Sequence, residues 1–317
     1  MTSARKLKVG VIGVGSLGQW HARIYSELES AELVGVYDTN QKRAAEIAAK
    51  YSTKAFDSID SLAASIEACS VVVPADKHFE VASLLINRGV NLLVEKPIAS
   101  TTEHAETMVK MADSKGLILQ VGHVERFNPV MKFLEEMLHT PRFIEAVRLS
   151  PYPIPFPGMQ ARGTEVSVVH DLMIHDLEII LHLVRSEVKE IHAMGVPVLS
   201  ATEDMANVRL RFESGCVANV TASRISLKKM RKIRVFQENT YVSLDYQNQS
   251  GELYRKKPSG ISVEQVPINK TDPLDDELRT FVECVINRNE PVVSGKHASK
   301  ALKLAVAICE HIRGGGS

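Results

Sequence analysis

The sequence lacks several features that would point to particular classes of protein. Its 317 residues carry 38 basic and 38 acidic side chains, so no excess of one charge favours a nucleic acid or an anionic membrane as partner. No apolar run approaches the ~18 to 20 residues that a membrane-spanning helix needs. The N-terminal residues enter a strand pattern without the apolar segment of a signal peptide. We therefore expect a cytoplasmic protein with a small-molecule partner, no nucleic acid and no membrane.

Cysteine is also scarce. The four cysteines are widely scattered and form no CxxC pair, which favours free thiols in a reducing compartment over disulfides or a zinc site. They are Cys69, Cys216, Cys284 and Cys309. At 44% hydrophobic residues, the chain can still bury a sizeable core and is long enough for two domains.

The first third of the chain alternates short β-branched runs with amphipathic stretches. This alternation of strand and helix patterns predicts a doubly wound parallel sheet. The strand patterns cover residues 8–14, 32–38, 68–74, 90–97 and 117–123, and the helical patterns cover 18–28, 41–50, 78–89 and 101–116.

The pattern changes near residues 122–126. A helical stretch at 123–139 is followed by short strand patterns without intervening helices, which predicts a mostly antiparallel sheet. These patterns cover 143–150, 190–196, 205–213, 216–223, 232–238, 240–246 and 261–268. Two helical stretches, 273–288 and 297–313, end the chain, and the second could pack back onto the first domain. The predicted fold class is therefore α/β, with an N-terminal parallel sheet followed by a large open sheet.

The motif GVGSLG lies directly after a predicted strand and at the start of a predicted helix. Glycine there allows a tight turn, close approach of a pyrophosphate to the backbone, and close packing of helix on sheet. The helix N-terminus adds amide donors for phosphate oxygens. We predict that a dinucleotide binds at Gly13, Gly15, Ser16, Leu17 and Gly18.

Asp38 ends the next predicted strand, where a carboxylate would accept hydrogen bonds from a ribose 2′-hydroxyl. A 2′-phosphate would be repelled there, so the sequence predicts NAD as cofactor rather than NADP. Lys42 and Arg43 lie close by in the sequence and could soften that preference.

The stretch HDLMIHDLEI, residues 170–179, holds two His-Asp pairs in a pattern typical of a buried helix. At about 100° per residue, Asp171 and His175 would lie one turn apart on the same face, with Glu178 and His182 continuing that stripe. A carboxylate beside an imidazole could be an acid–base pair, half of a metal site, or an ion pair that serves only the fold. We leave open the roles of the other two ionisable residues, His170 and Asp176.

Further motifs carry a family resemblance over residues 10–305. A strand ends in Glu95-Lys96-Pro97. The segment VPADKH (73–78) precedes it, and QVGHVERFNP (120–129), DLMIH (171–175) and VVSGKHASKAL (292–302) follow it in order. Together with the glycine motif, these resemble the Gfo/Idh/MocA family of sugar and cyclitol dehydrogenases. Val73 stands where the family's T-P-x-x-x-H loop has Thr, and Met173 replaces the central Gly of its D-x-G-x-H. We therefore do not carry over the family's pocket shape.

The resemblance implies a Rossmann domain at residues 1–124 and a substrate-binding and oligomerisation domain at 125–317, with the active site between them. It implies an NAD-dependent oxidoreductase that moves a hydride between nicotinamide and a secondary hydroxyl of a sugar, and a homo-oligomer, either a dimer or a tetramer. By position, it implies cofactor contacts for Pro74, His78, Glu95, Lys96 and Arg126.

Loss of a hydroxyl proton must accompany hydride transfer, and the ordinary pKa of histidine, near 6.5, suits that task. His175 is the candidate base, and Asp171 could orient its ring. Lys96, at the carboxyl end of a strand, could stabilise developing alkoxide charge or share in proton transfer. Glu95 would then hold Lys96 or a ribose hydroxyl.

GHVERFNP and TASR are most similar to the family branch that oxidises the C3 hydroxyl of UDP-N-acetylglucosamine and related UDP-sugars. The TASR segment begins a basic cluster that could bind a diphosphate. The cluster could equally be a solvated face, because alternate side chains of a strand point to opposite faces and only half of these charges would lie on one side. The cluster comprises Arg224, Lys228, Lys229, Arg231, Lys232 and Arg234. We predict that some of Arg162, Arg224 and Lys228 lie near the substrate phosphates.

Three alternatives remain open. The substrate could be a free sugar or inositol, for which the basic cluster would be irrelevant. A metal could use His175, Glu178 and His182, but zincin-type sites place two histidines at i and i+4, so we predict none. A non-catalytic NAD-binding sensor would keep the glycine motif and Asp38 but would need neither Lys96 nor His175.

Overall fold

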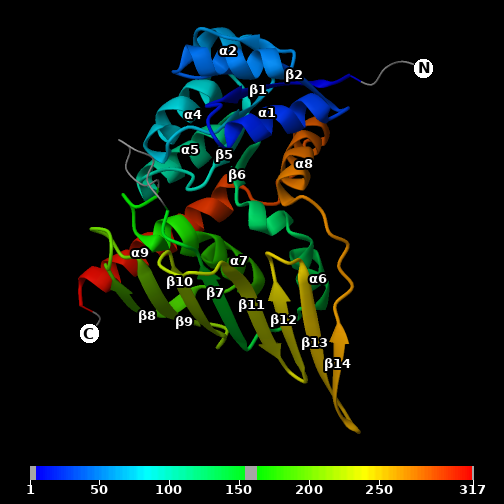
Figure 1. Ribbon diagram of the computed structural model, residues 1–317, viewed down its shortest axis with the longest axis vertical. Coiled ribbons are helices and arrows are strands. Elements are labelled where there is room, and N and C mark those ends of the chain that lie inside the picture. Colours follow the sequence, from blue (N-terminus) through cyan, green and yellow to red (C-terminus); the bar gives the residue numbers. More distant parts are fainter. Residues whose placement is uncertain (1–4, 154–162, 316–317) are drawn as a thin grey trace. The chain divides into compact units, whose positions relative to one another are not determined.

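The computed structural model describes residues 5–153 and 163–315, and the chain divides into two compact units. The first unit comprises Met1–Val124 and Asp272–Ser299, and the second comprises Glu125–Thr271 and Lys300–Ser317. Figure 1 follows the chain from β1 to α9. Each unit has its own sheet and its own hydrophobic core.

The first unit is built on six parallel strands in the order β3-β2-β1-β4-β5-β6. The strands are β1 (Leu7–Ile12), β2 (Ala31–Tyr37), β3 (Lys54–Ala55), β4 (Ala68–Val71), β5 (Asn91–Glu95) and β6 (Leu119–Gly122). The helices are α1 (Gly18–Glu27), α2 (Gln41–Lys50), α3 (Ile59–Ala63), α4 (His78–Asn87), α5 (Thr102–Ser114) and α8 (Pro273–Asn287), with the 3-10 turn η1 (Ala75–Lys77). The strand order reverses between β1 and β4, the place where open α/β sheets bind ligands.

Helices α1 and α8 lie side by side in this unit (Figure 1). Ile24 of α1 and Leu278 and Phe281 of α8 are fully buried in one cluster with the β1 strand. Side-chain caps begin most of the long helices: Asn40 caps α2 and Thr101 caps α5, as their residue types predict. Helix α1 differs, because no side chain caps it.

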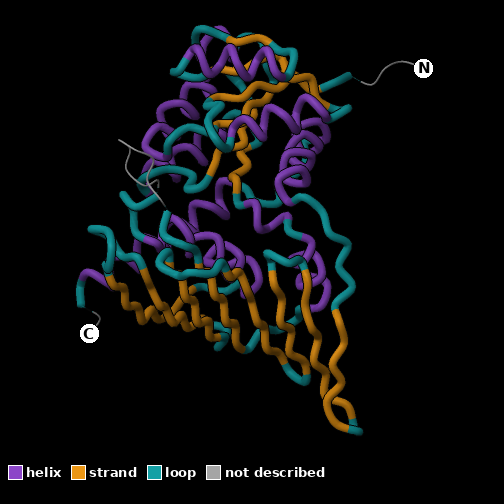
Figure 2. Tube along the Cα trace, viewed as in Figure 1, coloured by secondary structure: helices purple, strands orange, loops and turns teal. Residues whose placement is uncertain are grey.

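The second unit contains an eight-stranded sheet in the order β14-β13-β12-β11-β7-β10-β9-β8. The strands are β7 (Phe143–Leu149), β8 (Val188–Val196), β9 (Met205–Phe212), β10 (Val217–Ser223), β11 (Met230–Gln237), β12 (Thr240–Asp245), β13 (Ser250–Lys257) and β14 (Gly260–Gln265). Only the β10–β7 pair is parallel among these neighbours. Figure 2 shows these strands side by side in one open sheet.

One face of this sheet forms the core of the second unit. Ala206, Val208 and Leu210 of β9 alternate with exposed residues and are fully buried. The other segments of the unit are η2 (Val124–Phe127), α6 (Pro129–Met137), the π-helical turn η3 (Val169–Met173), α7 (Ile174–Val184) and α9 (Gly295–Arg313). Helix α9 contributes Leu304 and Ile308 to this core.

The predicted fold class is confirmed: a parallel Rossmann sheet is followed by a large, mostly antiparallel sheet. Helix α2 has the predicted bounds, residues 41–50. Strand β13 was missed because four charged side chains in SGELYRKK hide its alternation. It pairs with the outermost strand β14, where charge is tolerated. Within the described residues, no helix is both long and apolar enough to cross a membrane.

Glu277 is a buried acid in the core of the first unit. It belongs to α8 and is fully buried, and neither carboxyl oxygen has a hydrogen-bond partner among the described residues. Burial raises the pKa of Glu277 well above its usual range, and the nearby Glu95 carboxylate raises that pKa further. Burial therefore favours the neutral form of Glu277 in the folded protein.

Glu277→Gln should raise the melting temperature more at pH 8 than at pH 5. An unfolded glutamate has a pKa of about 4.3. Above that pH the folded state binds more protons than the unfolded state, so stability falls as pH rises towards the raised pKa of the folded protein. Glutamine keeps the shape of the neutral acid but does not titrate.

Thermal unfolding at both pH values measures this difference. Glu283→Gln, on the exposed side of the same helix, is the matched control and should have little effect at either pH. The same shift in melting temperature at both pH values for Glu277→Gln would contradict a neutral Glu277.

Candidate active site

The glycine turn connects β1 to α1 and contains three glycines with different surroundings. A Cβ on Gly13 would lie 2.4 Å from the Val72 carbonyl oxygen, and one on Gly18 would lie 1.8 Å from the Gly13 oxygen. Gly13 also has a φ of +85°. A Cβ on Gly15 would meet nothing within 4 Å. The chain itself therefore requires glycine at two of the three positions, whereas space is open at the third.

The start of α1 suits an anion. No acidic residue lies in its first turn, and no side chain caps it at Leu17. Ser16 and Gly15 are exposed beside this turn. Backbone amides at an uncapped helix N-terminus bind phosphate oxygens, so the turn fits the pyrophosphate of a dinucleotide.

Asp38 lies beside the same turn. Its carboxylate accepts hydrogen bonds from the backbone N–H of Val14 and of Asn40, both at 2.8 Å. Arg43 Nε donates to the Val14 carbonyl oxygen at 3.0 Å, and Arg43 Nη2 donates to Gln19 at 3.1 Å. The carboxylate is thus fixed at the edge of the turn, with one guanidinium bound on the other side of Val14.

The Glu-Lys-Pro motif follows the carboxyl end of β5, and the Lys96–Pro97 peptide bond is cis. The Glu95 carboxylate turns back towards the protein: Oε2 accepts from the Lys96 backbone N–H at 3.3 Å, and Oε1 lies 3.3 Å from His21 Nε2. A Cβ on Gly122 would come within 2.8 Å of Glu95 Oε1, so a glycine of β6 makes room for this carboxylate. Lys96 is half-buried, and the described contact from Glu95 reaches its backbone.

Both ring nitrogens of His78 lie near backbone oxygens, and the cofactor contact predicted for this residue stays a prediction. Its side chain is buried, with Nδ1 at 2.8 Å from the Pro97 oxygen and Nε2 at 3.0 Å from the Val73 oxygen. Burial lowers its pKa. His78 therefore connects the loop after β4 to the loop after β5, while Pro74 is exposed at the start of η1.

The segment that carries His175 begins with a π-helical turn rather than an α-helix. Val169–Met173 forms η3, and α7 starts at Ile174. Hydrogen bonds in a π-turn skip one more residue than in an α-helix, so steps of about 100° do not apply between Asp171 and His175. Residues four apart in such a turn still lie on nearly the same face, so the predicted stripe and the contact between the two residues stay predictions. Both side chains are half-buried.

Met173 occupies the position where the family motif has glycine. Because of this long side chain, we do not carry over the family's pocket shape. Met173 is fully buried and packs in the core of the second unit. The extra length of the side chain is therefore accommodated within that core.

Glu178 and His182, predicted to continue the stripe, bind structural partners instead. Glu178 Oε1 accepts from Arg126 Nη1 at 2.8 Å, and His182 Nε2 lies 2.8 Å from Glu135 Oε1. Burial raises the pKa of Glu178 to about 7, and the Arg126 guanidinium opposes that rise. Arg126, expected to contact the cofactor, is buried and also approaches Glu135, so its guanidinium is engaged within the second unit.

Asp176, left without a role from sequence, is held by Arg148. Arg148 Nε and Nη2 donate to its two carboxylate oxygens at 2.8 and 3.0 Å, and Arg148 Nη1 donates to Glu125 at 2.9 Å. All three side chains are buried. This bidentate pair fixes the start of α7 immediately after His175. His170, also left open, places Nδ1 3.5 Å from the Cys309 sulfur.

Arg224 does not present donors to a substrate phosphate. Its side chain is 2% exposed, and all five guanidinium N–H groups are used inside the protein. The phosphate contact predicted for it is therefore wrong for this arrangement. Lys228 is exposed in the turn between β10 and β11. Arg162 lies outside the described residues.

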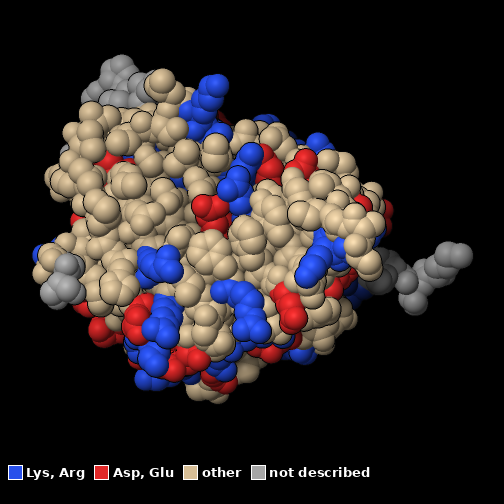
Figure 3. Space-filling view, turned by 90° about the horizontal axis from the view of Figure 1, so that it is seen from below, with Lys and Arg blue, Asp and Glu red and all other residues tan. Residues whose placement is uncertain are grey.

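The basic cluster of residues 224–234 does not form one surface. Arg231 Nη1 lies 3.0 Å from Glu125 and Arg234 Nη1 lies 2.9 Å from Glu145, while Arg224 is buried. Figure 3 shows acidic side chains interspersed among the basic ones on the face it presents. Strand alternation and local pairing thus divide the cluster, and Lys228 is its remaining candidate for a phosphate.

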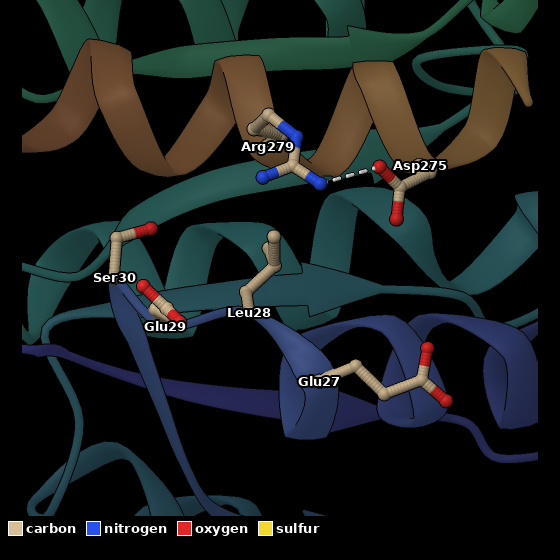
Figure 4. A pocket seen from close by; sticks show the side chains of 6 residues that line it. All are labelled: Glu27, Leu28, Glu29, Ser30, Asp275 and Arg279. Atoms are coloured by element: carbon tan, nitrogen blue, oxygen red, sulfur yellow. Dashed lines mark hydrogen bonds and ion pairs between the residues drawn. The ribbon is translucent and has the colours of Figure 1, made fainter. Parts of the chain in front are cut away.

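A pocket of about 450 Å³ in the first unit lies away from the glycine turn. It is lined by Glu27, Leu28, Glu29, Ser30, Asp275 and Arg279 (Figure 4). Its one guanidinium already pairs with Asp275 at 2.8 Å, which leaves a mainly acidic lining that would repel a nucleotide. It adjoins the end of α1 opposite the glycine turn.

No group of three or more histidine, cysteine or carboxylate side chains within residues 5–153 and 163–315 could hold a metal ion. The four cysteines are buried and free. The predicted site residues that the structure describes include the glycine turn, Asp38, Glu95 and Lys96 in the first unit and Asp171 and His175 in the second, and their assembly into one site stays a prediction.

Gly15→Ala should weaken NADH binding about tenfold without lowering thermal stability, because the added methyl group enters only the open space of the glycine turn. Gly13→Ala, the matched variant, should destabilise the fold by about 1–3 kcal/mol, since its Cβ meets a backbone carbonyl at positive φ. NADH fluorescence titration and thermal unfolding measure the two effects. Unchanged NADH affinity in Gly15→Ala would exclude the pyrophosphate from this turn.

Comparison with known proteins agrees with this geometry. Residues 7–123 match the model "Oxidoreductase family, NAD-binding Rossmann fold", and residues 137–242 match "GFO/IDH/MocA C-terminal domain". UDP-N-acetylglucosamine 3-dehydrogenase of Acidithiobacillus ferrooxidans is 34% identical over 95% of this chain and 96% of its own length. Its solved structure covers 98% of this chain and 99% of its own, with a TM-score of 0.91. Myo-inositol 2-dehydrogenase of Thermotoga maritima is 25% identical over 95% of both chains. The chain belongs to the Gfo/Idh/MocA family of NAD-binding oxidoreductases.

Proposed function

We propose that this protein is an NAD-dependent dehydrogenase that oxidises the C3 hydroxyl of UDP-N-acetylglucosamine or a related UDP-sugar. The observation that carries the proposal is the full-length match, at 34% identity and a TM-score of 0.91, to an enzyme named for that reaction. The presence of both Lys96 and His175 supports catalysis rather than cofactor sensing alone.

NAD rather than NADP is proposed because of Asp38. Its carboxylate is fixed beside the glycine turn, where it can accept bonds from ribose hydroxyls and would repel a 2′-phosphate. The open space at Gly15 and the uncapped start of α1 supply the pyrophosphate site. When bound there, NAD supplies the hydride acceptor.

The protein's own residues supply the proton chemistry in this proposal. His175 takes the proton from the reacting hydroxyl as general base, and Asp171 stabilises the imidazolium that results. Lys96 stabilises the alkoxide as it forms, through a charge-assisted hydrogen bond. Glu95 accepts from the Lys96 amide, and this holds the loop that carries the ammonium group.

Residues 1–124 are proposed as the cofactor domain and 125–317 as the substrate and oligomerisation domain, although residues 272–299 pack with the first compact unit. Lys228 and Arg162 remain the proposed phosphate contacts. A homo-oligomer and a cytoplasmic location are proposed from the family resemblance and the four free cysteines.

The second candidate function is oxidation of a free sugar or inositol. The similarity to myo-inositol 2-dehydrogenase over 95% of the chain favours it. The dispersed basic cluster also weakens the argument for a diphosphate, because Arg224 is buried and Arg231 and Arg234 pair with carboxylates.

Purified protein with NAD should form NADH with UDP-N-acetylglucosamine and not with free N-acetylglucosamine or myo-inositol. Protein is denatured before NADH is quantified, so that retained cofactor is counted. Turnover of a free polyol alone would reject the UDP-sugar as substrate and support the second candidate function. No turnover with any of the three would contradict both candidate functions.

His175→Ala should lower kcat by about 10²–10⁴-fold, the usual contribution of a general base. NADH affinity should stay within about twofold of the wild type, because the cofactor site proposed here uses residues of the other unit. His192→Ala, at an exposed position of β8, is the matched control. Full activity in His175→Ala would assign the base elsewhere.

Asp38→Ala should lower kcat/KM for NAD and raise it for NADP, each by about tenfold, or about 1.4 kcal/mol. The change removes the repulsion of a 2′-phosphate and leaves Arg43 in place beside Val14. Steady-state kinetics with both cofactors measure it, with Asp113→Ala as an exposed control in the same unit. An unaltered cofactor preference would show that Asp38 does not set it.

A further inference from the structure

Among the residues that the structure describes, Arg224 is the largest fully buried side chain, and every one of its donors has a partner. Nε donates to Asp204 at 2.8 Å. Nη1 donates to the carbonyl oxygens of Gly163 at 2.5 Å and Val166 at 2.8 Å, and Nη2 donates to the hydroxyls of Ser200 at 2.9 Å and Thr202 at 2.8 Å. A guanidinium is retained in such a place only when its donors are satisfied, and here all five are.

Asp204 completes this arrangement from the start of β9. Its Oδ2 accepts the backbone N–H groups of Val198 at 2.8 Å, Leu199 at 2.6 Å and Ser200 at 2.9 Å, and its Oδ1 accepts the Ser200 hydroxyl and Arg224. Burial alone would raise the pKa of Asp204, but the bonds from Ser200 and Arg224 lower it well below its usual range. The pair thus stays charged at neutral pH and holds the 198–204 loop against residues 163–166.

The segment that Arg224 holds leads directly into the His175 helix. The Thr202 hydroxyl also donates to the Val166 oxygen at 2.9 Å, and the Val168 N–H donates to the Glu203 oxygen at 2.9 Å. Asp171 N–H then bonds back to the Ser167 oxygen at 3.1 Å. The described residues from 163 to the π-turn are therefore tied to one buried ion pair.

Gly163 connects the ion pair to the candidate catalytic carboxylate. Its φ is +87°, and a Cβ there would lie 2.8 Å from Asp171 Oδ2. The bare face of Gly163 thus packs directly against the Asp171 carboxylate, while its carbonyl oxygen accepts Arg224. Both the positive φ and the nearby Asp171 carboxylate therefore require glycine at this position.

We propose that Arg224 is a positioning residue: with Asp204 it fixes Gly163 against the Asp171 carboxylate and so sets the orientation of Asp171 for proton transfer. Arg224 acts through Gly163 and Asp171 and touches neither substrate nor cofactor. The effect on turnover rests on the proposed function, in which Asp171 supports the base His175. The effect of Arg224 on local structure does not depend on the proposed function.

Kinetics of Gly163→Ala, Asp171→Ala and the double variant test the proposal. Gly163→Ala should lower kcat about tenfold or more, with KM for NAD within about twofold, because it displaces a catalytic group without touching the cofactor site. In the Asp171→Ala background, Gly163→Ala should lower kcat by less than about twofold, because the carboxylate that it would displace is absent. Equal losses in both backgrounds would overturn the proposal.

Arg224→Lys keeps the charge but loses the planar fork, and it should show the same loss in kcat with the same dependence on Asp171. Arg211→Lys is the control: Arg211 is an exposed residue of β9 that pairs with Glu190 at 3.3 Å, and its change should leave kcat unaltered. A rise in the KM of the UDP-sugar with kcat unchanged in Arg224→Lys would instead return Arg224 to substrate binding.

Hydrogen–deuterium exchange of the amides from 164 to 173 separates this inference from the proposed function. Arg224→Lys should speed exchange there at least about tenfold while Arg211→Lys does not, whether or not any substrate turns over. Wild-type protein without turnover but with this exchange change would refute the proposed function alone. Unchanged exchange in folded Arg224→Lys would refute the positioning role.

Discussion

A buried guanidinium must be paired with a carboxylate, and this constraint organises the second unit. Arg148 binds Asp176 with two hydrogen bonds directly after His175, and Arg126 binds Glu178 two residues further along α7. Arg224 with Asp204 holds the segment before the π-turn. Breaking one partner of such a pair leaves an uncompensated charge in the interior, which costs about 3–5 kcal/mol. The three arginines therefore fix both ends of the segment that carries Asp171 and His175.

The predicted cofactor site of the first unit depends on open space at the glycine turn more than on charged side chains. Gly13 and Gly18 let the backbone of the turn pack against β4 and against itself, and Gly15 leaves an open position beside an uncapped helix. Asp38 is a fixed charge at this edge, because two backbone N–H groups hold its carboxylate in place. Pre-organised groups of this kind bind without the entropic cost of ordering them.

Local patterns were enough to predict much of the fold and the cofactor side of the site. Strand and helix periods predicted both sheets, and the turn glycines and Asp38 lie within one βαβ unit, where sequence spacing determines spatial neighbours. The contacts of His78 and Arg224 could not be predicted, because their partners lie in separate loops. Both ring nitrogens of His78 lie near backbone oxygens, and Arg224 combines two backbone carbonyls with two hydroxyls and a carboxylate, which no local pattern records. The π-turn could not be predicted because a residue period of 3.6 assumes a regular α-helix. Asp176 and Glu178 were identified as unusual, but their buried arginine partners lie in other elements of the unit.

The central claim, hydride removal from C3 of a UDP-sugar, is tested most directly with UDP-N-acetylglucosamine that carries deuterium at C3. The labelled sugar is mixed with protein and NAD, and the reduced cofactor is analysed by mass spectrometry after the protein is denatured. The account predicts reduced cofactor that is one mass unit heavier than that from unlabelled sugar. Reduced cofactor without deuterium, or deuterium transferred only from a free polyol, would contradict it.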